Sequence, residues 1–110
     1  MVKYQKDEII QLHAQFCSAL SDANRLLILY TLSEGELNVG ELAAQLNIPQ
    51  PTISRHLKVL RERGMVASKR EGPAVVYRLG DDRVIQALDL LRTMMADTLK
   101  SQLALAENID

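Results

Sequence analysis

The sequence predicts a mainly α fold with one small β-hairpin, and three observations lead to that expectation. Two short amphipathic helical patterns are separated by the turn Asn47–Pro49. Strand-forming residues then flank a Gly72-Pro73 turn signal, and apolar residues recur at helical spacing in the C-terminal part. A helix-turn-helix followed by a two-stranded β-wing, an α+β winged helix, accounts for all three within one domain spanning residues 1–110.

The N-terminal third predicts two helices of different character. The segment 7–20 has acidic residues near its positive end, and its apolar residues approximate one face: Ile9, Leu12, Phe16 and Leu20. The segment 23–33 follows a capping Ser21 or Asp22 and is apolar nearly all round until Gly35. Periodicity alone would also allow a buried strand there, but the length, the cap and the stop favour a buried central helix.

The helix-turn-helix is predicted over residues 38–63. Asn38 and Glu41 have the spacing of a capping box for a short helix that ends near Leu46. The second helix begins near Gln50, with Pro51 in its first turn, and stops at Gly64. Its apolar stripe would face the core and consists of Ile53, Leu57 and Leu60.

The other face of this second helix can hydrogen-bond base edges and hold phosphates, and it offers no carboxylate. Its members are Gln50, Thr52, Ser54, Arg55, Lys58 and Arg61. The arrangement is typical of a recognition helix in the second position of a helix-turn-helix. An ordinary amphipathic helix with a solvated polar face would show the same pattern, so the neighbouring segments have to decide.

A wing is predicted over residues 65–79, with extended segments on both sides of the turn 71–74. Lys69 and Arg70 fall near the tip and Arg78 on the return strand, where cations could contact the DNA backbone or minor groove. A hairpin that only covers a helical core is the alternative.

Charge is segregated along the chain. Residues 50–79 carry seven basic and two acidic side chains, a net charge of +5, whereas the rest carries six basic and twelve acidic, a net charge of −6. A basic patch on an acidic body is typical of a polyanion binder.

A final helix is predicted over residues 82–103, about 33 Å long at the usual rise per residue. Its apolar stripe comprises Val84, Leu88, Leu91, Met95 and Leu99. This is more apolar surface than the preceding unit can cover, so pairing with a second copy, together with the helix at 7–20, is the expected solution. Packing against its own core is the rival explanation.

Composition excludes several other classes of protein. Cys17 is the only cysteine, so no disulfide framework exists within the chain, and with no signal peptide a cytoplasmic location is expected. No apolar run approaches the roughly 20 residues of a membrane span, so no membrane partner is expected. Two histidines, one cysteine and no glycine-rich phosphate loop make an enzyme the weakest interpretation.

Four segments together resemble the signature of ArsR-type (ArsR/SmtB) winged helix-turn-helix regulators: residues 20–29, 41–43, 50–60 and 64–66. The resemblance covers nearly the whole chain. It implies a homodimeric bacterial or archaeal transcription factor, usually a repressor, that leaves operator DNA when an inducer binds. It also implies base contacts by Gln50, Thr52, Ser54 and Arg55, and phosphate contacts by Lys58, Lys69 and Arg70.

The sequence departs from the metal-sensing members of that family. Asn38 and Gly40 stand where those members carry a Cys-x-Cys pair, and no histidine follows His56 to supply a zinc site on the last helix. We therefore expect no metal cofactor and a non-metal inducer, whose identity the sequence does not reveal.

Two alternatives remain beside the repressor. Cys17 lies four residues after His13 on one helix face, so a thiol- or metal-responsive regulator is conceivable, although a lone cysteine in an apolar helix is usually a small buried side chain. A winged-helix module that binds an acidic protein partner is the other. His56 is expected to be a structural hydrogen-bonding residue.

Overall fold

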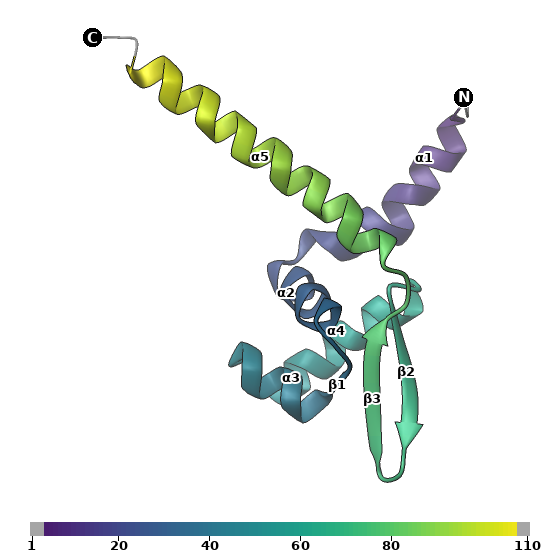
Figure 1. Ribbon diagram of the computed structural model, residues 1–110. Coiled ribbons are helices and arrows are strands. Elements are labelled where there is room, and N and C mark those ends of the chain that lie inside the picture. Colours follow the sequence, from purple (N-terminus) through teal and green to yellow (C-terminus); the bar gives the residue numbers. More distant parts are fainter. Residues whose placement is uncertain (1–3, 108–110) are drawn as a thin grey trace.

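The computed structural model describes residues 4–107, and residues 1–3 and 108–110 of the expected domain lie outside this range. The elements follow one another around a small helical body (Figure 1). In chain order they are α1 (Lys6–Leu12), the π-helical turn η1 (His13–Cys17), the 3-10 turn η2 (Ala19–Ser21), α2 (Ala23–Ser33), β1 (Leu37–Asn38), α3 (Val39–Leu46), α4 (Gln50–Glu62), β2 (Val66–Glu71), β3 (Ala74–Leu79) and α5 (Arg83–Glu107).

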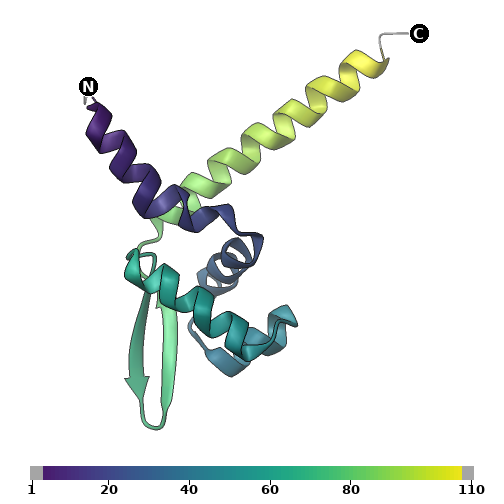
Figure 2. The same ribbon diagram turned by 180° about the vertical axis from the view of Figure 1, so that it is seen from behind.

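The elements separate into a body and two projecting helices. Helices α2, α3 and α4 pack together beside the sheet, while α1 and most of α5 extend away from the end opposite the hairpin tip (Figure 2). Within the described range, no helix has both the length and the apolar character needed to cross a bilayer.

The core lies between the three body helices and the base of the hairpin. Its fully buried large side chains are Ile28, Leu29, Leu42, Ile53, Leu57, Leu60 and Met65. The apolar segment 23–33 is thus a helix at the centre of the body, as predicted. Asp22 caps its N-terminus by accepting bonds from the N–H groups of Asn24 and Arg25. The predicted stripe of α4 is likewise entirely buried.

Helix α3 begins with the predicted capping box. The N–H of Glu41 donates to Oδ1 of Asn38 at 2.8 Å, and Oε1 of Glu41 accepts the N–H of Asn38 at 3.0 Å. Both bonds satisfy backbone donors that a short helix cannot pair internally.

We expect Asn38→Ala to lower the free energy of unfolding by about 1 kcal/mol, because one N-terminal donor of α3 loses its acceptor. Urea titration followed by circular dichroism measures the change, and Asn38→Ser, which keeps a capping oxygen, is the matched control. Equal losses in the two variants would contradict a capping role for this side chain.

The wing is part of a three-stranded sheet in the order β1-β3-β2, so the prediction of two strands was incomplete. The short strand β1 pairs antiparallel with β3, Leu37 opposite Tyr77. It escaped the sequence pattern because a two-residue strand has no alternation to detect. The hairpin itself is tighter than predicted: Glu71 pairs with Ala74, Gly72 takes a φ of 61°, and Pro73 holds a negative φ, as a type II′ turn requires.

The predicted single helix at 7–20 is wrong in one respect, because a π turn interrupts it. The N–H of Ser18 donates to the carbonyl of His13 at 2.9 Å instead of to that of Ala14. The Ala14 carbonyl accepts the Ser18 hydroxyl and Nη1 of Arg63, each at 2.8 Å. These side-chain donors replace the missing helical bond, so the widened turn costs no unpaired acceptor.

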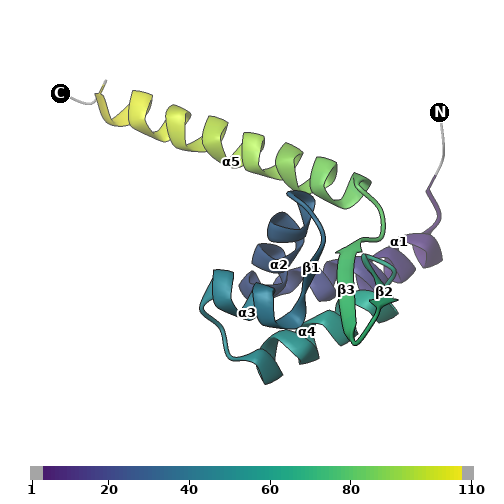
Figure 3. The same ribbon diagram turned by 60° about the horizontal axis from the view of Figure 1, so that its bottom comes forward.

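Helix α5 begins one residue later than predicted and continues to Glu107. Only Leu88 of α5 is fully buried, Val84 and Ile85 pack partly against the core, and the C-terminal part of the helix projects beyond the body (Figure 3). The rival expectation, a last helix folded onto its own core, is therefore wrong for most of α5.

Candidate nucleic-acid interface

Helix α4 presents one apolar and one polar face, and the polar face is accessible. Gln50, Ser54, Arg55 and Lys58 are exposed and Thr52 is half-buried. The turn before α4 and the hairpin tip point away from the projecting helices α1 and α5 (Figure 2). The side of the body that can meet a long polyanion is thus opposite the side that carries the projecting apolar helices.

Arg55 and Thr52 are oriented together on the polar face. Nη2 of Arg55 donates to Oγ1 of Thr52 at 3.3 Å, across one helical turn. This bond is long and exposed, so it leaves the guanidinium free to form a bidentate pair with a base edge or a phosphate.

The wing cations Lys69 and Arg70 are both exposed on β2 and lie opposite Val76 and Val75. Successive residues of a strand point to opposite faces, so the two cannot both project toward the same surface. Nζ of Lys69 lies 3.8 Å from Oε1 of Glu71, an exposed pair that is worth little and that a phosphate can displace.

His56 connects α4 to the start of α2, and the sequence pattern did not reveal its partners. Nη1 of Arg25 lies 3.4 Å from Nδ1 of His56, and Nε2 of His56 lies 3.9 Å from Oδ1 of Asp22. Since a guanidinium can only donate, Nδ1 accepts and the imidazole proton belongs on Nε2, facing the carboxylate. The prediction of a structural role for His56 therefore agrees with its position.

Asp22 is the acidic centre of this cluster. Partial burial alone would raise the pKa of its carboxyl group, but hydrogen bonds from the N–H groups of Arg25 and Asn24, with electrostatic stabilisation by the neighbouring His56 and Arg25 side chains, outweigh it and lower the pKa. The stabilising contribution of this carboxylate is present above its unfolded pKa and is lost as the pH falls through the lowered folded value.

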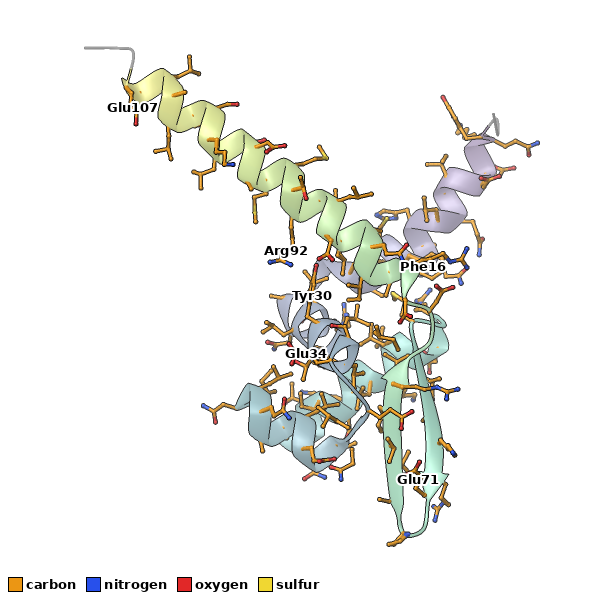
Figure 4. The ribbon with its side chains drawn as sticks, viewed as in Figure 1. Phe16, Tyr30, Glu34, Glu71, Arg92 and Glu107 are labelled. Carbon is orange, nitrogen blue, oxygen red and sulfur yellow. The ribbon has the colours of Figure 1, made fainter. Side chains whose placement is uncertain are left out.

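A shallow apolar groove of about 490 Å³ lies between α2 and α5. Leu26, Leu27, Leu88, Leu91 and Met95 supply most of its lining. At its rim, Tyr30 and Arg92 lie against each other (Figure 4), with the guanidinium carbon 5.2 Å from the ring centroid.

Asp89 joins these two rim residues. The Tyr30 hydroxyl donates to Oδ1 of Asp89 at 2.8 Å, and Nη1 of Arg92 lies 3.2 Å from the same oxygen. Desolvation and the bond to Asp89 raise the pKa of Tyr30 above its ordinary value. The three side chains thus join α2 to the first turns of α5.

Cys17 is exposed, so the expectation of a small buried side chain was wrong. The π turn that holds it also brings no ligand cluster together: among residues 4–107, no group of three or more His, Cys, Asp or Glu side chains could hold a metal ion.

The chain matches the family described as "Bacterial regulatory protein, arsR family" over residues 22–68, which run from the cap of α2 into β2. It is 44% identical over 72 residues to a biofilm growth-associated repressor from Agrobacterium fabrum. That match covers 66% of this chain and 62% of the relative, so the chain spans less than two thirds of that protein's length.

Two solved structures are similar to this chain over most of its length. The transcriptional repressor BigR from Xylella fastidiosa superposes with a TM-score of 0.69 at 36% identity, covering 83% of this chain and 96% of that one. The homodimeric winged helix-turn-helix DNA-binding domain from Mycobacterium bovis superposes with a TM-score of 0.77 at 26% identity, covering 92% and 95%. The predicted winged-helix fold is confirmed by these similarities.

Proposed function

The chain belongs to the arsR family of bacterial regulatory proteins, and we propose that it is a homodimeric, sequence-specific repressor that an inducer releases from operator DNA. The observation that carries this proposal is the exposed polar face of α4, which carries no carboxylate from Gln50 to Arg61, while the apolar stripe on the opposite face is buried. Gln50, Thr52, Ser54 and Arg55 would read base edges, and Lys58 would hold a phosphate.

The wing would add contacts that position the protein without reading sequence. Lys69 and Arg70 point to opposite faces of the hairpin. We therefore expect only one of the two side chains to contact a DNA phosphate in any one bound arrangement. The net charge of +5 over residues 50–79 supports binding of a polyanion in this orientation.

Helices α1 and α5 would form the dimer interface. In α1 no residue is buried, and Ile9, Ile10 and Leu12 are exposed. Along α5 the exposed apolar side chains are Leu90, Leu91, Met94, Met95, Leu99, Leu103 and Leu105. An apolar surface of this extent is typical of an interface, and a two-fold dimer would present two copies of α4 to the half-sites of a palindrome.

The inducer would not be a metal held where the metal-sensing members carry thiolates. Asn38 at that position already uses its side chain to cap α3, and Gly40 has no side chain to offer. The groove between α2 and α5 supports an apolar small molecule instead, since its lining is apolar and it adjoins the proposed interface.

The test is fluorescence anisotropy of the purified protein on its own upstream DNA and on scrambled DNA, each at several salt concentrations. We expect the native fragment to bind about a thousandfold more tightly than the scrambled one. The slope of affinity against salt would count the phosphate contacts. Equal, weak binding to upstream, scrambled and selected random DNA would overturn the proposal and favour a module that binds an acidic protein.

A further inference from the structure

Two arginines hold helix α4 to the α1 segment, by which we mean residues 14–19, the turns that continue α1. Neither arginine belongs to the predicted base-reading or phosphate-binding residues. Arg63 is the residue that ends α4, and Arg25 lies in the first turn of α2. Both are partly buried, and both guanidinium groups donate to backbone carbonyls of the segment 14–19.

The first contact is made at the C-terminal end of α4. Nη1 of Arg63 donates to the carbonyl of Ala14 at 2.8 Å, across 49 residues of sequence. That carbonyl is available because the π turn diverts the N–H of Ser18 to His13. The interruption of α1 and the anchoring of α4 are therefore one feature, and π turns of this kind frequently mark functional sites.

The second contact is made near the middle of α4. Nε of Arg25 donates to the carbonyl of Ala19 and Nη2 to that of Ser18 at 3.4 Å, while Nη1 faces Nδ1 of His56. His56 has a side chain that is only 14% exposed, so this arrangement has little freedom to swing. Arg25 thus bridges the same α1 segment to α4.

Two anchoring points constrain an orientation, whereas one would leave a pivot. His56 and Arg63 are seven residues apart, which is two helical turns and about 10 Å along the axis of α4. On the opposite side, the accepting carbonyls extend from Ala14 to Ala19. The angle between α4 and the end of the proposed dimerisation segment is therefore held at both positions.

We propose that Arg25 and Arg63 are positioning residues that set the half-site spacing which the dimer accepts. This inference rests on the proposed homodimeric, DNA-binding function. In a two-fold dimer, the distance and angle between the two recognition helices follow from how each α4 is fixed to its own dimerisation helices. Loosening α4 would let the dimer accept half-sites at several spacings, while the base contacts of each α4 remain.

The test uses the full-length chain and the palindromic duplex that the wild-type protein selects from random DNA. Variants of this duplex have the spacer lengthened or shortened by one base pair, and anisotropy measures affinity for each. We expect the wild type to lose about tenfold in affinity on a changed spacer, and Arg63→Ala to lose no more than about twofold.

Three controls separate positioning from general damage. Arg83→Ala removes an exposed cation that lies outside the predicted DNA-contacting residues and should keep the spacing preference of the wild type. Arg63→Lys can still donate to Ala14 and should restore part of that preference. Thermal unfolding checks that Arg63→Ala is folded, and Arg25→Lys, which shortens the second anchor without removing its charge, should relax the preference in the same direction.

Two failures can be told apart. If the wild type and Arg63→Ala lost equal affinity when the spacer of the selected palindrome was changed, the positioning role would be overturned and the proposed function would stay intact. A wild-type protein that selects no sequence would overturn the proposed function, and this inference with it.

Discussion

Met94→Glu is expected to convert the protein to a monomer and to weaken operator binding by about a hundredfold or more, because two linked recognition helices become independent. Met94 is 64% exposed on α5, beside Leu90 at 69%. In a two-fold dimer each copy would bring one new carboxylate into an apolar interface, where an unpaired charge is strongly unfavourable. Sedimentation equilibrium gives the mass, and anisotropy on operator DNA gives the affinity.

Gln86→Glu is the matched control for this prediction. Gln86 is exposed in the first turn of α5, two turns before Met94 and outside the projecting part of the helix, and the substitution adds the same charge to the same helix. We expect this variant to stay dimeric and to keep its affinity for the operator within about twofold. A dimeric Met94→Glu protein would place the interface elsewhere on the molecule.

Arg55→Ala is expected to reduce operator affinity between about fivefold and about 150-fold, the range for losing one bidentate base contact of about 1 to 3 kcal/mol. Arg55 is exposed and bonds only Thr52 within the described chain, so its removal should not disturb the core. Specificity should relax at the base pair it reads. Titration against a panel of operators with single substitutions measures both effects.

Lys58→Ala, measured in the same titrations, distinguishes the loss of a base contact from the loss of a phosphate contact. Lys58 is exposed one turn further along α4, and a phosphate contact there should weaken every duplex about equally and reduce the salt slope by about one. An Arg55→Ala protein that behaved in this uniform way would move Arg55 from the base-reading residues to the phosphate-binding residues.

Much of the fold could be predicted because it follows from local chemistry. Three features each depend on residues that lie close together in the sequence: the capping box of Asn38, the turn before Pro51 and the apolar stripe of α4. The structure places all three as predicted. The polar face of α4 follows from the stripe by geometry alone. Its role in reading DNA stays a prediction, since no bound duplex tests it.

What escaped prediction involves partners far apart in sequence. The strand β1 exists only because β3 pairs with it, and at the π turn His13–Cys17 the freed carbonyl of Ala14 accepts a bond from Arg63, 49 residues away, as well as from the nearby Ser18 hydroxyl. The bridge from Arg25 to His56 is of the same kind.

The sequence by itself determined the helix-turn-helix, the hairpin and the amphipathic α4, because capping, turn geometry and apolar periodicity act over one or two turns of chain. Only the tertiary structure decided how α4 is anchored to the α1 segment and how far α5 projects, because those features depend on which distant donors and apolar faces meet.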